Sequence, residues 1–153
     1  MSRSAIVSAP LDVAALLTEV NAPSNGAVCT FIGTVRNSSD GRNVTGLEYS
    51  AYTEMATREM DDILREVTAL ENGVEIVAVH RIGALRVGEP CVVIAAAHAH
   101  RNAAFVACRY VIEEIKKRVP IWKRELYEDG THEWVNACAN GDSDAVSIVS
   151  AAS

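Results

Sequence analysis

The chain has 153 residues, a length that suits one domain and allows a hydrophobic core without metal or disulfide crosslinks. Hydrophobic residues make up 49% of the sequence and charged residues 22%, which argues against a disordered chain. The net charge of −6 argues against a general nucleic-acid or anionic-membrane partner.

The sequence shows no targeting or crosslinking signal. No apolar run is long enough to cross a bilayer, and the first residues lack the apolar stretch of a signal peptide. The four cysteines are scattered without a C-x-x-C pair, so neither a disulfide framework nor a zinc ribbon is indicated. We therefore expect a cytoplasmic protein that binds neither nucleic acid nor a membrane.

The first half of the chain predicts a strand, a helix and two further strands. In chain order we expect a strand at 4–9, a helix from 13 to 20 capped by Asp12, a β-rich run at 27–35, a polar loop at 36–43 and a strand at 44–49. The helix is predicted because its apolar residues recur on one face.

The second half predicts two helices and four strands. We expect a helix that begins at Thr53 and stops near Gly73, strands at 74–80 and 91–98, a helix capped by Asn102 and ended by Pro120, and a hairpin of 121–127 with 132–138. The Asp129–Gly130 pair predicts a type I′ turn in that hairpin. Three helices interleaved with about seven strands indicate an α+β fold in one domain at 1–138, followed by a tail of small and polar residues at 139–153.

A basic segment at 116–124 is the strongest local signal. It holds five of the fourteen Lys and Arg residues and no acidic residue. Cations in a last helical turn suit the helix dipole, which explains Lys117 and Arg118 without a ligand. Lys123 and Arg124 lie beyond the proline, on an expected strand, and are better explained by an anionic ligand. A desolvated lysine there could also act as a nucleophile or base.

The stretch from His98 to Arg101 follows an apolar strand and precedes a helix. The pair His98 and His100 could bind zinc, but no third ligand stands at a convincing spacing. The N–H groups at the start of the helix, together with Arg101, favour an anion pocket instead. We interpret His98 itself as a core histidine with satisfied hydrogen bonds.

Two strand exits complete the pattern of candidate residues. Gly33 inside a β run indicates a bulge or a close approach, and Arg36 follows at the mouth of that strand. The segment 80–83 is a similar transition from a strand to a turn, and its position supports a structural and a functional role equally well. Together these features predict a phosphate-bearing small molecule held by Arg36, His100, Arg101 and the basic segment.

Four segments, at 31–37, 80–83, 99–101 and 116–125, together resemble the catalytic (large) subunit of molybdopterin synthase. The most specific of them reads K-x-R-x-P-x-W-K-[RK]-E, and the resemblance runs from about Gly26 to Trp134. It implies a hammerhead-like α/β domain with an added antiparallel β subdomain. It also implies sulfur transfer from the C-terminal Gly-Gly thiocarboxylate of a small ubiquitin-like subunit to cyclic pyranopterin monophosphate, within a heterotetramer built on a central homodimer.

The resemblance also implies roles for individual residues, and no metal or cofactor. Lys116 and Lys123 match the two lysines placed by the partner's C-terminus. The substrate pocket would be formed by Thr34, Val35, Arg36, His100, Arg101, Arg124 and Glu125, with support from Phe31, Pro120 and Trp122. The chain departs from the family at Thr34, where lysine is frequent, and at 136–138, where a charged residue is expected.

Two alternatives belong to other classes of protein. A non-catalytic adaptor could bind a ubiquitin-like Gly-Gly tail without needing the phosphate-binding cations. A metal-dependent hydrolase could use His98 and His100, and would contain stoichiometric zinc.

Overall fold

The computed structural model describes residues 2–136, which contain three helices and nine strands in an α+β arrangement. The helices are α1 (Val13–Val20), α2 (Thr53–Leu70) and α3 (Arg101–Arg118). The strands are β1 (Arg3–Val7), β2 (Ala27–Thr34), β3 (Ser38–Ser39), β4 (Arg42–Ala51), β5 (Glu75–Arg81), β6 (Gly83–Arg86), β7 (Pro90–His98), β8 (Ile121–Tyr127) and β9 (His132–Asn136). The expected tail at 139–153 lies outside the described residues, so that division of the chain stays a prediction.

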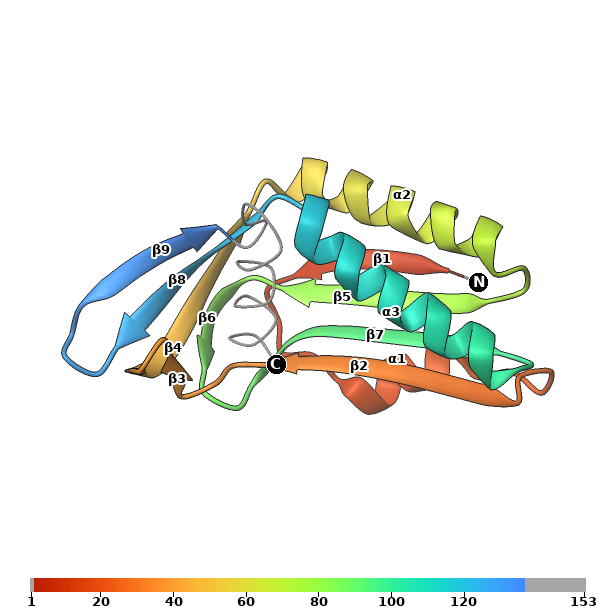
Figure 1. Cartoon of the computed structure of the whole chain (residues 1–153), viewed down its shortest axis with the longest axis horizontal. Coiled ribbons are helices and arrows are strands. Elements are labelled where there is room, and N and C mark those ends of the chain that lie inside the picture. The colour runs from red at the N-terminus through yellow and green to blue at the C-terminus, as the bar shows by residue number, and fades with distance from the viewer. Residues whose placement is uncertain (1, 137–153) are drawn as a thin grey trace.

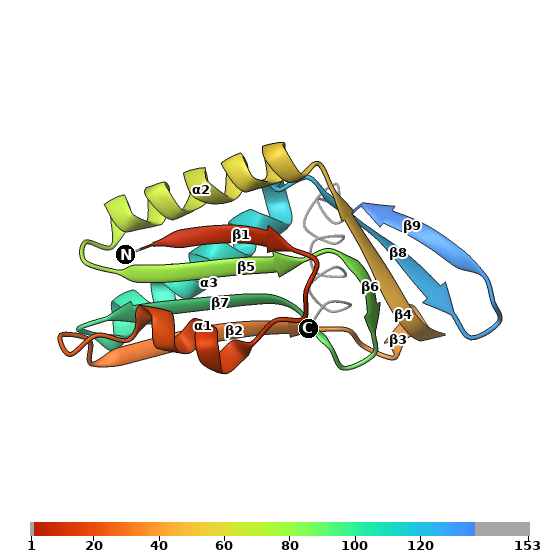
Figure 2. The same ribbon diagram turned by 180° about the vertical axis from the view of Figure 1, so that it is seen from behind.

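The first sheet has the strand order β1-β5-β7-β2, in which only β1 and β5 run parallel. Helices α2 and α3 cover one face of this sheet and α1 covers the other (Figures 1 and 2). Because both faces are covered, β5 and β7 are almost continuously buried. Two hydrophobic clusters follow: a large one under α2 and α3, and a smaller one under α1.

The second sheet stands at one end of the first and has the order β3-β4-β8-β9, with β6 paired to β4 (Figure 1). Its strand β8 follows α3 directly, because Pro120 ends the helix and the chain turns into extended structure. Along β8 buried and half-buried residues alternate without interruption. The inner face of β8 is therefore buried, with Ile121 and Tyr127 in the large hydrophobic cluster, and its outer face is half-buried.

The hairpin turns differ from the prediction. Asp40 and Gly41, inside the expected loop at 36–43, have φ of 48° and 77° and connect β3 to β4 as a two-residue turn. Positive φ at both positions is the type I′ geometry. In the β8–β9 hairpin only Gly130 has positive φ, and its N–H donates to the Tyr127 carbonyl at 3.0 Å. The type I′ prediction at Asp129–Gly130 is therefore wrong, because the loop there is longer.

Other boundaries shift by a few residues. The N-cap of α3 is His100 and not Asn102, and its side chain makes no capping hydrogen bond. The strand expected at 44–49 extends over β4, from Arg42 to Ala51. The bulge expected at Gly33 is confirmed, since the register of β2 with β7 shifts between Gly33 and Thr34.

A test of this architecture is the substitution Gly46→Ala in β4. A Cβ at Gly46 would lie 2.9 Å from the backbone carbonyl oxygen of Leu85 in β6, a distance that forces the two strands apart. We expect a loss of about 1–3 kcal/mol in the free energy of unfolding, measured by urea denaturation. Ser50→Ala, at an exposed position of the same strand, is the control and should change it by less than about 0.5 kcal/mol. Equal stability of the two variants would contradict the described β4–β6 pairing.

Candidate functional site

The described residues bury four polar or charged side chains in the core, and all four come from segments that the sequence analysis singled out. Their exposed fractions are 1% for His80, 5% for Lys116, 1% for Lys123 and 3% for Glu125. Burial of a charged group is costly unless partners or a function compensate for it. The group thus marks the candidate site.

Local structure explains how the two lysines come together. Lys116 lies in the last turn of α3, and Lys123 lies on the inner face of β8 just beyond the turn at Pro120. Glu125 follows on the same face, with its Oε1 atom 3.9 Å from the Lys123 Nζ atom. Ser39 of β3 donates a hydrogen bond of 3.2 Å to the same Oε1 atom. The turn at Pro120 therefore leaves Lys123 near enough to Lys116 for the charge of Lys116 to lower the pKa of Lys123.

Arg36 completes the buried cluster from a different part of the chain. It follows β2, and its positive charge is near enough to lower the pKa of Lys123. Its Nε atom is buried and has no hydrogen-bond partner among the described residues. Arg36 and Lys116 thus lie near Lys123, whose carboxylate neighbour is Glu125. We define these four residues as the lysine cluster, whose excess positive charge suits an anionic ligand.

Lys123 has an unusual electrostatic environment. Burial is the main cause that lowers its pKa to about 8; the charges of Lys116 and Arg36 act in the same direction, and Glu125 acts in the opposite direction. A lysine whose pKa lies near neutrality exists partly as a neutral amine under physiological conditions. Such an amine can accept a proton or act as a nucleophile.

Three buried residues next to the lysine cluster were not among the predicted site residues. Tyr49 lies directly opposite Lys123 in the β4–β8 register, so both side chains are on the inner face. The rings of Tyr49 and His80 meet edge to face, with centroids 5.0 Å apart. Cys91 of β7 is near enough for its thiol to influence the pKa values of both Tyr49 and Lys123. Only the segment around His80 carried a sequence signal, and that signal left its role open.

Arg81 and Glu89 form a clamp that supports the loop carrying Arg36. Arg81 Nη1 donates to Glu89 Oε2 at 2.5 Å, and this bond together with two from Arg86 lowers the pKa of Glu89 to about 2. The Glu89 carbonyl accepts a 3.1 Å hydrogen bond from the N–H of Val35. Val35 is itself buried. The clamp therefore fixes the backbone immediately before Arg36.

Several predicted site residues lie away from the lysine cluster. Trp122 and Arg124 alternate with Lys123 along β8 and therefore lie on its outer face. There Trp122 packs edge to face on Tyr52 with ring centroids 5.0 Å apart, and Arg124 pairs with Glu48. Arg124 thus has an ion-pair partner outside the cluster, and its side chain is not brought to the lysines.

Three other predicted residues take positions along the sheet and the turn. Thr34 ends β2 opposite Pro90, half-buried, at the bulge that precedes Arg36. Phe31 is half-buried in the middle of β2 and lines an apolar depression of about 390 Å³ between that strand and α3. Pro120 lies in the turn that joins α3 to β8. Thr34 and Pro120 thus affect the lysine cluster through the course of the backbone: Thr34 lies at the bulge before Arg36, and Pro120 lies at the turn between Lys116 and Lys123.

His100 and Arg101 lie at the opposite end of α3 from Lys116. Both are exposed and line a depression of about 510 Å³ with Gly26 and Phe105. At a rise of 1.5 Å per residue, the helix separates the backbones of Arg101 and Lys116 by about 22 Å. The expectation that all the predicted cations converge within one chain is therefore corrected: only Arg36, Lys116 and Lys123 do so.

His98 uses both of its ring nitrogens within the chain. Nε2 lies 2.9 Å from the Asn72 carbonyl oxygen, and Nδ1 accepts a 3.0 Å hydrogen bond from the backbone N–H of His100. The satisfied histidine expected at this position is thus confirmed, although it is half-buried at a strand end and not in the core. Across residues 2–136 no group of three or more His, Cys, Asp or Glu side chains is arranged to hold a metal ion.

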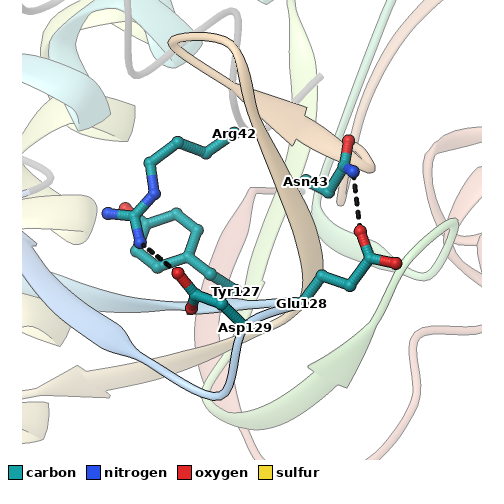
Figure 3. A pocket seen from close by; sticks show the side chains of 5 residues that line it. All are labelled: Arg42, Asn43, Tyr127, Glu128 and Asp129. Atoms are coloured by element: carbon teal, nitrogen blue, oxygen red, sulfur yellow. Dashed lines mark hydrogen bonds and ion pairs between the residues drawn. The ribbon is translucent and has the colours of Figure 1, made fainter.

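A polar pocket of about 350 Å³ lies at the far end of the second sheet, and Figure 3 shows its lining. The Arg42 guanidinium stacks over the Tyr127 ring at 3.5 Å and pairs with Asp129 at 3.4 Å. Asn43 donates a 2.6 Å hydrogen bond to Glu128. Its charges thus find partners within the two hairpins, so the pocket stabilises the sheet and offers less to a ligand than the lysine cluster does.

Related proteins match most of the length of this chain. The sequence model of the MoaE protein family matches residues 6–118. A molybdopterin synthase catalytic subunit from Thermoplasma volcanium is 48% identical over 125 residues, which are 82% of this chain and 89% of that protein. The subunit from Bacillus subtilis is 42% identical over 88% of this chain and 85% of its own length. A longer relative of the same name from Oryza sativa subsp. japonica is 46% identical over 80% of this chain, which spans 64% of that relative.

Solved structures agree with the sequence relatives. Molybdopterin synthase from Staphylococcus aureus matches with a TM-score of 0.82 and 36% identity, over 86% of this chain and 96% of that chain. A protein–protein complex of subunits 1 and 2 of molybdopterin-converting factor from Helicobacter pylori matches with a TM-score of 0.71 and 26% identity, over 88% of this chain and 89% of that chain. No helix of the described residues is long and apolar enough to cross a membrane. The α+β fold and the family predicted from the sequence are confirmed, and the chain belongs to the MoaE family.

Proposed function

We propose that this chain is the catalytic subunit of a molybdopterin synthase. It transfers sulfur from the C-terminal thiocarboxylate of a small ubiquitin-like subunit to cyclic pyranopterin monophosphate and so forms the molybdopterin dithiolene. The observation that carries the proposal is the buried pair Lys116 and Lys123 beside Arg36, in a family whose relatives bear that name. The free cysteines Cys29, Cys91 and Cys108 suit a reducing, cytoplasmic setting.

The chemistry of the proposed reaction matches the charge of the lysine cluster. The donor enters as a thiocarboxylate anion, each transfer leaves a carboxylate, and the acceptor carries a phosphate, so negative charge accumulates where sulfur is transferred. Preorganised cations stabilise such charge best where water is excluded. A pure adaptor for a Gly-Gly tail has no need of two buried lysines with a half-buried arginine nearby.

We assign distinct roles to the two lysines. Lys116 is the principal catalytic lysine, which activates the attack by the thiocarboxylate sulfur or holds a transient covalent link. Lys123, whose pKa lies near 8, assists proton transfer and orients the phosphate. Glu125, at 3.9 Å, keeps the Lys123 side chain on the inner face. Arg36 contributes a guanidinium with unused hydrogen-bonding capacity.

The proposed assembly includes the small subunit and a second copy of this chain. The Helicobacter pylori relative was solved as a complex of two subunits, which supports a small partner for this chain. The positions of His100 and Arg101 support the central homodimer. If these residues bind the substrate phosphate, the 18-residue length of α3 prevents them from reaching Lys116 of the same chain. They would therefore act on the lysine cluster of the second copy.

The first test replaces Lys116 by alanine. With thiocarboxylated partner and precursor, Lys116→Ala should lose more than about 100-fold in the rate of dithiolene formation, because charge that develops in the site is no longer stabilised. Lys117→Ala is the matched control, since Lys117 is exposed and pairs with Glu114 at 3.5 Å. The product is quantified by fluorescence after oxidation. Wild-type turnover by Lys116→Ala would overturn the assignment.

The second test is a pH profile of single-turnover sulfur transfer. The pKa of Lys123 is lowered to about 8, so the neutral amine predominates above that pH and the ammonium below it. We expect the rate to rise through pH 8 and to level off, and Lys123→Arg to lack this ascending limb. Circular dichroism at each pH controls for unfolding. A wild-type rate that is constant from pH 7 to 9 would argue against proton transfer by Lys123.

The third test asks whether the site combines residues of two chains. Arg101→Ala and Lys116→Ala should each be inactive as a homodimer. Subunits mixed after mild dissociation should regain about a quarter of wild-type activity, because half of the dimers are mixed and each has one intact site. Mixing Lys116→Ala with Lys123→Ala should restore none, since both lysines belong to the same cluster. No recovery in the first mixture would contradict a site shared between two chains, and an active Arg101→Ala homodimer would place Arg101 outside the reaction.

A further inference from the structure

The turn that joins β6 to β7 holds the backbone next to Arg36. The Val35 carbonyl accepts a 2.8 Å hydrogen bond from the N–H of Gly88, and the Val35 N–H donates to the Glu89 carbonyl at 3.1 Å. Both backbone groups of Val35 are thus bound to one turn, and its side chain is buried in the large hydrophobic cluster. In both views of the chain this turn lies beside the connection from β2 to β3 (Figures 1 and 2). The residue before Arg36 therefore has a fixed position.

The residue after Arg36 is held as well. The Asn37 carbonyl accepts a 2.8 Å hydrogen bond from the N–H of Val44 in β4. The Arg36 backbone thus lies between two hydrogen-bonded neighbours, whereas its Nε atom is buried without a hydrogen-bond partner among the described residues. A guanidinium with a fixed backbone and an unused donor suits an anion, because less conformational freedom remains to be lost on binding.

The Glu89 carboxylate determines how this turn is held. Its Oε1 atom accepts two 3.0 Å hydrogen bonds from Arg86, one from the backbone N–H and one from Nε, and its Oε2 atom accepts one of 2.5 Å from Nη1 of Arg81. The Glu89 N–H donates back to the Arg86 carbonyl at 3.1 Å. Gly88 between them has a φ of 88°, which glycine adopts without steric cost. The carboxylate therefore closes the turn and joins it to the end of β5.

Glu89 keeps its charge under physiological conditions. The hydrogen bond from Arg81, followed by those from Arg86, lowers the pKa of Glu89 to about 2, so the carboxylate is ionised at neutral pH. Because both of its oxygens are bound by these arginines, and because like charges repel, Glu89 is unsuited to contact an anionic ligand itself. Its effect on the site passes through the backbone of the turn.

We propose that Glu89 is a positioning residue for Arg36: its carboxylate locks the β6–β7 turn onto Val35, and Val35 in turn presents the Arg36 guanidinium to the anionic ligand. This role deepens the proposed function and rests on it. Without the carboxylate the turn loses its connection to Arg81, and the backbone that Val35 shares with Arg36 is free to shift. A displacement of about 1 Å in a group that binds substrate can lower the rate up to about 100-fold.

The test is a double-mutant cycle in the complete enzyme with its partner. Glu89→Gln keeps the size of the side chain and removes its charge, and we expect it to lower kcat/KM for the precursor about tenfold, as for a misplaced binding group. In the Arg36→Ala background the same change should lower kcat/KM less than about twofold, because the group that Glu89 positions is absent. A purely structural role would act equally with and without Arg36.

Glu19→Gln is the matched control. Glu19 on α1 accepts hydrogen bonds of 2.6 and 2.7 Å from Arg3, and α1 covers the other face of the first sheet. Loss of this ion pair should leave kcat/KM unchanged. A tenfold loss on Glu89→Gln in both backgrounds, or no loss in the presence of Arg36, would overturn the positioning role.

A second measurement observes Arg36 without any reaction. In the ¹⁵N-labelled full chain, the NMR order parameter of the Arg36 backbone amide should be about 0.85, as for rigid backbone, and should fall in Glu89→Gln but not in Glu19→Gln. A fall in Glu89→Gln combined with no sulfur transfer by the wild type would reject the proposed function and keep the positioning role. An unchanged order parameter in Glu89→Gln would overturn the positioning role.

Discussion

Buried positive charge is the constraint on which this structure depends. Lys116 and Lys123 are buried at the edge of the hydrophobic core with the half-buried Arg36 nearby, and Glu125 is the buried carboxylate next to Lys123. Transfer of unbalanced charge from water to such a place opposes folding. The shift of the Lys123 pKa toward neutrality measures part of that cost. In the proposed function an anionic ligand offsets this cost, so the charges that oppose folding are the ones assigned to binding and catalysis.

The fold positions the three cations near one another. The first sheet is covered by helices on both faces, and α3 carries Lys116 to the end of it where the second sheet begins (Figure 1). The turn at Pro120 then places Lys123 on the inner face of β8, while strand alternation sends Arg124 to the outer face. The clamp between Arg81 and Glu89 holds the chain before Arg36. Each cation thus comes from a different element, and packing fixes their relative positions.

Local patterns in the sequence predicted most of the fold and part of the site. Helical spacing and Pro120 located the three helices, and the basic segment located both lysines, because those signals are short-range. The sequence did not reveal that Tyr49 lies opposite Lys123, since strand register depends on pairing between distant segments. It also grouped Arg101 with Lys116, although the length of α3 separates them within one chain. The type I′ turn was predicted at Asp129–Gly130 but occurs at Asp40–Gly41, because the two residues alone do not determine the length of the loop that contains them.

The most direct measurement of the central claim is a crystal structure of the complex between this chain and the small partner subunit with its Gly-Gly carboxylate. The account predicts that the terminal carboxylate enters the site and lies within hydrogen-bonding distance of Lys116 or Lys123, with Arg36 beside it. A tail bound on the outer face of β8, against Trp122 and Arg124, would contradict it. The buried lysines would then be structural, and the proposed chemistry would have to take place elsewhere.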